Sequence, residues 1–185
     1  MNTPPQRAAA DLLTKHRVCD APVPVTDLAR AVGATLRVGP LEQELSGFLL
    51  RRGTTAIIGV NALHPRSRQR FTVAHEIGHL LLHQDMTEHV DRGISFYFRD
   101  ERSSQAAIRQ EIDANQFAAE LLMPRPMIDA LVRETVDVHD DDLLEELAAH
   151  FDVSVQALTY RLTNLGLRPA KTTTSRLRSR ASSRR

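Results

Sequence analysis

Two histidines and a glutamate stand at a spacing that suits metal chemistry. His75, Glu76 and His79 form the pattern His-Glu-x-x-His within residues 71–83, where apolar residues recur at helical spacing. At 3.6 residues per turn, side chains four positions apart lie on one face of a helix, so both imidazoles could bind one Zn²⁺ ion. Glu76 could then act as general base toward a water molecule held by the ion. The pattern predicts a zinc hydrolase, although a motif with so few fixed positions also arises by chance on amphipathic helices.

A catalytic zinc ion needs a third protein ligand and one open position. His83 shares the helix face but lies a rise of about 12 Å from His75, so one ion cannot bind both. Glu111 is the stronger candidate, because it lies on the next long predicted helix, which could return antiparallel to the first. Asn115, one turn later, could hydrogen-bond a metal-binding imidazole. Asp113 stays open as an alternative to Glu111, since the two lie roughly 200° apart around the helix and cannot both face the ion.

Helices are the main elements that must hold these residues. Helical periodicity, prolines near helix starts and stop signals such as Gly33 and Pro124 predict helices at about 3–18, 26–33, 65–83, 104–124, 126–133, 143–150 and 154–165. Runs rich in β-forming residues predict strands at 35–38, 46–50 and 56–60, with a hairpin turn at 51–54. Residues 84–102 have no clear period and are expected to form a long loop over the site. We therefore predict an α+β fold that is mainly helical, with a small antiparallel sheet.

Composition limits the class of protein further. With 42% hydrophobic and 25% charged residues, a chain of 185 residues is globular. Cys19 is the only cysteine, which excludes an internal disulfide and a thiolate zinc cluster. No apolar run is long enough to span a membrane and no signal peptide is recognisable, so we expect a cytoplasmic protein. The net charge of +1 includes six positive charges after residue 170, so the body is acidic and the tail basic.

The chain is expected to divide into three parts. A metallopeptidase domain would occupy residues 1–135, a packed helical subdomain residues 136–168, and a disordered basic tail residues 169–185. Residues 143–167 have the pattern of a helix-turn-helix. The second helix is thinly basic, with Arg161 and Arg168 as its only positive charges and several acidic residues nearby, so we expect a structural cap or a docking element and no direct binding to DNA.

The motifs resemble those of the ImmA/IrrE metallopeptidases. The resemblance rests on residues 71–83 (FTVAHEIGHLLLH) and, more specifically, on residues 111–124 (EIDANQFAAELLMP). Residues 46–49 and 61–70 also fit, so the resemblance covers about residues 20–168. It implies a minimal gluzincin-like zincin of the short ImmA type. Such a fold carries the zinc ligands on a helix pair, beside a small sheet whose edge strand can receive an extended substrate.

Residue by residue, the resemblance implies His75, His79 and Glu111 as zinc ligands and Glu76 as the general base. It implies Asn115 as a residue that supports the ligands without binding the ion. Family members often carry Glu where this chain has Asp113, a position that should point away from the ion.

The reaction implied is peptide hydrolysis, and it needs a hydrogen-bond donor for the oxyanion. Tyr160, Tyr97, His89 and Arg99 all have suitable chemistry, with Tyr160 favoured because its helix could fold back over the cleft. A strand near residues 56–60 could bind the substrate along its edge.

Two functions remain open. The first is a zinc endopeptidase that cuts a helix-turn-helix repressor encoded nearby and so derepresses stress or mobile-element genes, as the resemblance implies. The second is a non-catalytic regulator, such as half of a toxin-antitoxin-like pair, with a structural zinc site and terminal helices that bind a partner or DNA. Glu76 favours the first, because a structural site needs no base beside its ligand. The sequence does not give the oligomeric state.

Overall fold

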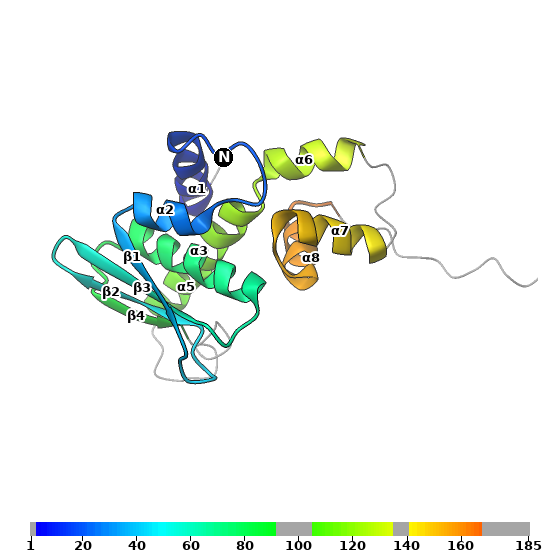
Figure 1. Cartoon of the computed structure of the whole chain (residues 1–185). Helices are drawn as coiled ribbons and strands as arrows, with labels where there is room; N and C mark the ends of the chain where they lie inside the picture. The colour runs from blue at the N-terminus through cyan, green and yellow to red at the C-terminus, as the bar shows by residue number, and fades with distance from the viewer. Residues whose placement is uncertain (1–2, 92–104, 135–140, 168–185) are drawn as a thin grey trace, which may run out of the picture.

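The computed structural model describes residues 3–91, 105–134 and 141–167. Within them the chain forms seven helices and one four-stranded sheet (Figure 1). The helices are α1 (Pro4–Lys15), α2 (Val25–Ala31), α3 (Arg66–Leu82), α5 (Gln105–Leu122), α6 (Arg125–Glu134), α7 (Asp141–Phe151) and α8 (Val155–Asn164). The strands are β1 (Ala34–Gly39), β2 (Gly47–Arg52), β3 (Thr55–Asn61) and β4 (Glu88–Asp91). The prediction of a mainly helical α+β fold is confirmed.

The sheet is mixed, and the prediction of an antiparallel sheet is wrong. Its strand order is β1-β3-β2-β4, with β1 parallel to β3 and the other neighbours antiparallel. β2, the next strand along the chain after β1, lies two positions away from β1 in the sheet. The hairpin after β2 then places β3 between β1 and β2. Because β3 then has a neighbour on each side, it cannot receive a substrate peptide along its edge as predicted.

One buried asparagine organises the crossover between β1 and β2. Asn61 Oδ1 accepts hydrogen bonds from the backbone nitrogens of Leu41 (3.2 Å) and Leu63 (3.0 Å). Its Nδ2 donates to the backbone oxygens of Glu42 (3.1 Å) and Leu45 (2.8 Å). These bonds satisfy backbone groups that the irregular segment leaves without partners in the sheet. The side chain of Asn61 therefore fixes the path that makes the sheet mixed.

Helix α3 lies in the middle of the molecule. It packs against β2 and β3 on one side and along α5 on the other, as Figure 1 shows. Residues 72–79 are consequently all buried, although a helix at the surface would bury only one face. Ile58 and Leu49 of the sheet, Ile77 of α3 and Phe117 of α5 form the centre of this core. Any chemical group on this part of α3 is therefore enclosed by protein.

The structure adds one strand that the sequence did not predict. β4 lies within the stretch expected to be a loop, and it pairs antiparallel with β2. Its burial alternates, so that His89 and Asp91 are buried while Glu88 and Val90 are exposed. Residues 92–102 of the expected loop and the tail at residues 169–185 lie outside the described residues.

Helices α7 and α8 form a pair joined at residues 152–154. The side chain of Ser154 caps α8 by accepting a hydrogen bond from the backbone nitrogen of Ala157 (3.1 Å). Leu158 and Leu162 of α8 and Phe151 of α7 are buried in the main core. The helix-turn-helix character of this pair and the predicted domain boundaries stay predictions.

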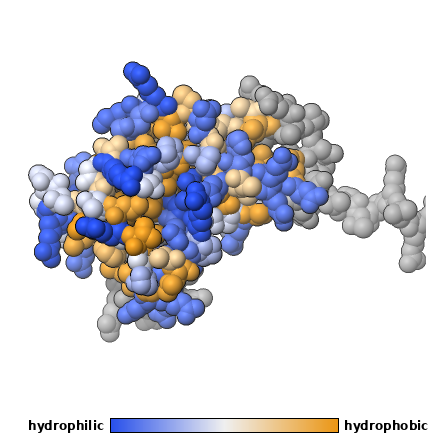
Figure 2. Space-filling model, in the orientation of Figure 1, coloured by the Kyte–Doolittle hydropathy of each residue, from blue (hydrophilic) through white to orange (hydrophobic). Residues whose placement is uncertain are grey.

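The surface is chemically mixed. On the face in Figure 2, hydrophobic and hydrophilic residues are interspersed over both the sheet and the helices. Among the described residues, no helix combines the length and apolar character that a membrane span requires.

Candidate metal centre

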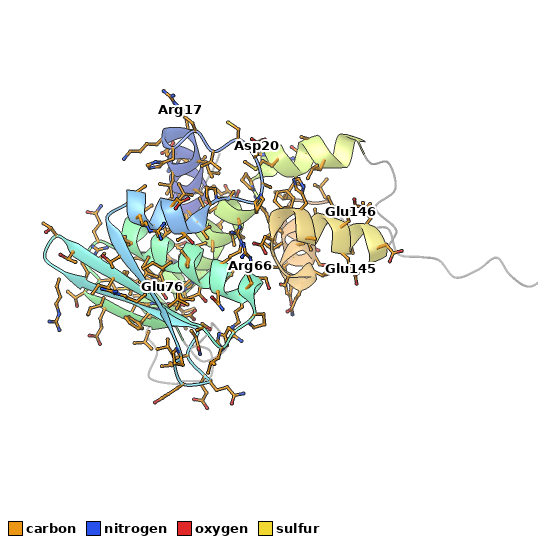
Figure 3. The ribbon with its side chains drawn as sticks, viewed as in Figure 1. Arg17, Asp20, Arg66, Glu76, Glu145 and Glu146 are labelled. Carbon is orange, nitrogen blue, oxygen red and sulfur yellow. The ribbon has the colours of Figure 1, made fainter. Side chains whose placement is uncertain are left out.

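Helix α3 brings two imidazoles together as the motif requires. His75 and His79 lie one turn apart, and their Nε2 atoms are 3.0 Å from each other. Both side chains are buried, and Glu76 between them is fully enclosed. In Figure 3, Glu76 lies where α3 faces the sheet. The three residues predicted from spacing thus meet in one buried place.

Helix α5 returns a carboxylate to the same place. Glu111 is buried, with Oε2 at 3.5 Å from His75 Nε2 and Oε1 at 3.2 Å from His79 Nε2. The helices approach closely here because Gly78 of α3 faces Ala114 of α5. A β-carbon on Gly78 would lie 3.1 Å from Ala114 Cα. Small residues at this crossing therefore place Glu111 beside the two histidines.

The three groups fit a tetrahedral metal ion. With bonds of about 2.0–2.1 Å, ligand atoms around such an ion should stand roughly 3.3 Å apart. The two histidine nitrogens are 3.0 Å apart, close to this value, and each lies 3.2–3.5 Å from one oxygen of the Glu111 carboxylate. Glu111 Oε2 is also buried with no hydrogen-bond partner among the described residues, an arrangement that an ion would relieve. The donor set of imidazoles and a carboxylate suits zinc.

His89 of β4 enters the centre from a third element. Its Nδ1 lies 3.1 and 3.3 Å from the two oxygens of Glu76, and its Nε2 lies 2.7 Å from Glu111 Oε1. His75, His79, His89 and Glu111 together form a buried group able to hold a metal ion. The sequence analysis considered His89 only as an oxyanion donor. His89 and Asp91 are two residues apart, the period of a strand, but one such pair is too short a pattern to identify a strand from the sequence.

Asp91 adds a further carboxylate at the edge of the centre. It is buried, and one of its oxygens lies within 4.8 Å of ligand atoms of both His75 and Glu76. Sequence reasoning did not consider it, because the segment was expected to be a loop.

Burial and hydrogen bonding shift the acid–base properties of these groups. Burial raises the pKa of Glu76, and the opposing effect of His89 does not cancel it. Burial lowers the pKa of His79 to about 3. For His89 burial acts downward, but hydrogen bonds to Glu111 and Glu76 outweigh it and raise the pKa to about 10. Burial acts upward on Glu111, yet its contacts with His75, His79 and His89 hold its pKa below the usual range. The lowered pKa of His79 favours its neutral form, which is the form that binds a metal ion.

The other predicted site residues take different positions. His83 lies outside the metal-binding group, and its Nε2 is 3.2 Å from the backbone oxygen of Gln110. Asn115 donates from Nδ2 to the backbone oxygen of Glu111 (2.9 Å) instead of contacting an imidazole. The Nδ1 atoms of His75 and His79 have no hydrogen-bond partner among the described residues.

Tyr160, the favoured oxyanion donor, leaves 65% of its surface exposed on α8 and is not part of the buried cluster. Its role stays a prediction that this position does not support. Tyr97 and Arg99 lie outside the described residues.

The fold thus places the His-Glu-x-x-His helix opposite a glutamate on a second helix, with a buried group of side chains able to hold a metal ion. Residues 29–163 match the peptidase family described as the IrrE N-terminal-like domain, and the chain belongs to this family. The resemblance to ImmA/IrrE proteins is thereby confirmed.

Two similar proteins extend the comparison. The radiation response metalloprotease IrrE of Deinococcus radiodurans is 35% identical over 107 residues, which cover 58% of this chain and 30% of that protein. The chain thus spans less than a third of this curated relative. A solved structure named Mycobacterium tuberculosis transcriptional regulator aligns with a TM-score of 0.61 at 17% identity, covering 88% of this chain and 47% of that one. The similarity to this second protein shows a shared fold.

Proposed function

We propose that the protein is a zinc-dependent endopeptidase of gluzincin-like zincin type. Its zinc ligands are His75, His79 and Glu111, and Glu76 is its general base. The observation that carries the proposal is the position of Glu76, a carboxylate with no exposed surface beside three groups that fit a metal ion. Burying a carboxylate is costly, and a purely structural site has no use for one that is not a ligand.

Each residue then has a defined task. When bound, the ion would polarise the scissile carbonyl and make the attacking water more acidic. Glu76 accepts the proton of that water at its carboxylate and returns it to the leaving nitrogen. The raised pKa of Glu76 brings its proton affinity closer to that needed for both steps near neutral pH. Enclosure by α3, α5 and β4 limits water around the reacting atoms, which strengthens every electrostatic contact there.

We further propose that the substrate is a helix-turn-helix repressor encoded near the gene. Cleavage would derepress stress or mobile-element genes, which places the protein in the cytoplasm and requires no direct contact with DNA. This part of the proposal rests on the family resemblance. The name of the Deinococcus relative, a radiation response metalloprotease, is in keeping with a role in stress.

A second candidate function is supported by one observation. His89 is a fourth potential ligand, and four protein ligands would close the shell around a zinc ion, as in structural sites. The protein would then be a non-catalytic regulatory partner, with zinc serving its fold or its docking.

The substitution Glu76→Gln separates the two functions. Glutamine keeps the size of the side chain and is not a proposed ligand, so the variant should bind as much zinc per chain as the wild type. Cleavage of the neighbouring repressor should fall by roughly 100-fold or more, because the general base is lost. Zinc content by mass spectrometry and cleavage on gels provide the two measurements. If both proteins hold zinc and both leave every candidate repressor intact under activating conditions, the non-catalytic function is the better account.

A further inference from the structure

The imidazole of His89 lies between two carboxylates that have different tasks in the proposed reaction. One nitrogen faces Glu76, the proposed base, and the other faces Glu111, the proposed third ligand. The side chain is only 5% exposed, and it comes from β4 while the carboxylates come from α3 and α5. A single rigid ring thus connects three elements at the centre.

Both contacts have the chemistry of hydrogen bonds donated by the ring. An ionised carboxylate can only accept, so with both glutamates ionised each ring nitrogen must carry a proton. The distances of 3.1 Å to Glu76 Oε2 and 2.7 Å to Glu111 Oε1 suit charge-assisted bonds. Because the separation of Nδ1 and Nε2 is fixed within the ring, His89 also fixes how far apart the two carboxylates stand.

The geometry favours this bridging role over direct binding of the metal ion by His89. Its ring stacks on that of His79, with ring centres 3.9 Å apart and planes inclined by 28°. Two ligands of one tetrahedral ion must instead aim their nitrogens at it from different directions. The nitrogen of His89 nearest the cluster is engaged with Glu111 Oε1, while Glu111 Oε2 has no hydrogen-bond partner among the described residues. One oxygen of Glu111 is therefore held by His89, and the other is left for the ion.

We propose that His89 is a positioning residue that aligns the general base and the third metal ligand at the same time. Its Nδ1–H orients the carboxylate of Glu76, and its Nε2–H holds Glu111 so that Oε2 faces the ion. The proposed alignment of Glu76 rests on the proposed function. The proposed alignment of Glu111 requires only that the centre binds metal.

Two substitutions can test the contact with Glu76 and the contact with Glu111 separately. The amide nitrogen of asparagine or of glutamine can replace only one of the two ring nitrogens of histidine. The Nδ2 atom of asparagine occupies about the place of histidine Nδ1, so His89→Asn keeps the donor to Glu76 and loses the donor to Glu111. The Nε2 atom of glutamine occupies about the place of histidine Nε2, so His89→Gln does the opposite. The variants remove the same ring from the same strand, and each is the control for the other. Thermal unfolding checks that both are folded.

The first measurement is zinc affinity, by competition with a chromophoric chelator in the absence of any substrate. His89→Asn should bind zinc about 10- to 100-fold more weakly than the wild type, as expected when a hydrogen bond to a metal ligand is lost. His89→Gln should stay within about threefold of the wild type. Equal affinities for the two variants, whether both weakened or both unchanged, would overturn the bridge to Glu111.

The second measurement is repressor cleavage at saturating zinc. His89→Gln should lose roughly 10-fold or more in kcat with KM unchanged, because Glu76 loses a charge-assisted hydrogen bond. His89→Asn should lose clearly less kcat than His89→Gln once zinc is saturating. A loss confined to KM, or one of equal size in both variants, would overturn the bridge to Glu76. If the wild type itself cleaves no repressor, the proposed function and this half of the bridge fail together, while the zinc measurement still decides the other half.

Discussion

The two oxygens of Glu111 differ in their surroundings, and this difference defines its proposed role. Oε1 lies near His79 and His89, whereas Oε2 is buried without a hydrogen-bond partner among the described residues. Asp113, the alternative ligand, follows two positions later on α5, is partly exposed and is absent from the metal-binding group. The carboxylate that faces the histidines is thus the one predicted to bind the ion.

Replacing each acid by its amide tests this assignment. Glu111→Gln should weaken zinc binding by more than about 100-fold, because a ligand is lost and loss of a supporting hydrogen bond already costs up to that much. Asp113→Asn should stay within about threefold of the wild type. Zinc per chain after dialysis, together with competition against a chelator, measures both. A greater loss in Asp113→Asn than in Glu111→Gln would show that the third ligand had been assigned to the wrong acid.

Spacing within a helix predicts which residues share a face of that helix. Site residues whose positions depend only on this spacing were therefore predictable from the sequence, and the others were not. His75 and His79 meet as their spacing requires, and Glu111 lies where the return of the second helix was expected. Asn115 bonds within its own helix, since the backbone oxygen one turn earlier is the nearer acceptor. The position of His89 depends on strand pairing with β2, which no local pattern encodes.

At the scale of elements, the centre depends on how closely α3 and α5 approach. Gly78 lacks a side chain at the place where Ala114 and Phe117 of α5 come nearest. A β-carbon there would lie 3.1 Å from both Ala114 Cα and Phe117 Cδ1. Such contacts are too short, and because one partner is backbone, the helices would have to separate by a few tenths of an ångström.

Gly78→Ala should therefore weaken zinc binding several-fold while changing the unfolding temperature little. Alanine stabilises a helix by up to about 1 kcal/mol relative to glycine, which offsets part of the cost of separating α3 from α5. Metal binding has no such compensation, because Glu111 moves with α5 while the histidines stay on α3. Gly39→Ala is the matched control, since nothing lies within 4 Å of a β-carbon at that position of β1. Equal zinc affinities in the two variants would show that the close crossing is not needed for the site.

Helix positions were largely predictable, and strand order was not. Pro65 and Pro124 flank α3 and α5 because proline cannot continue a helix from the residues before it, so these bounds follow from local chemistry. The insertion of β3 between β1 and β2 depends on distant contacts and on the buried side chain of Asn61. β4 was missed because four residues are too few for a period to be recognised.

At the scale of the whole molecule, two arginines connect the α7–α8 pair to the helices that hold the centre. Arg161 of α8 donates to both oxygens of Glu120 on α5 (2.7 and 2.5 Å) and from Nε to the backbone oxygen of Met123 (3.0 Å). Arg70 of α3 donates to the backbone oxygens of Asp152 (3.0 Å) and Val23 (2.9 Å). The C-terminal helices are therefore bonded to the same two helices that carry the proposed ligands.

The buried pair of Arg161 and Glu120 should contribute far more to stability than an exposed one. Their side chains are 5% and 12% exposed, so Arg161→Ala leaves a carboxylate mostly enclosed without its partner. A loss of about 3–5 kcal/mol in the free energy of unfolding is expected, measured with urea on the metal-free protein. Arg66, labelled in Figure 3, offers the control. Its bond to Asp152 also connects α3 to the α7–α8 pair, but its side chain is 79% exposed. Arg66→Ala should cost no more than about 1 kcal/mol.

A double variant separates the loss of attachment from the burial of an unpaired charge. In Arg161→Met with Glu120→Leu, both charges are replaced by apolar side chains of similar volume, which often costs little in a buried position. Most of the stability lost in Arg161→Ala should then return. If the double variant is as unstable as Arg161→Ala, the essential contacts are the hydrogen bonds that the apolar pair cannot make, from Arg161 Nε to Met123 and from Gln6 to Glu120. If Arg66→Ala and Arg161→Ala cost the same, burial is not what gives the Arg161 pair its strength, and α8 is held by its apolar residues alone.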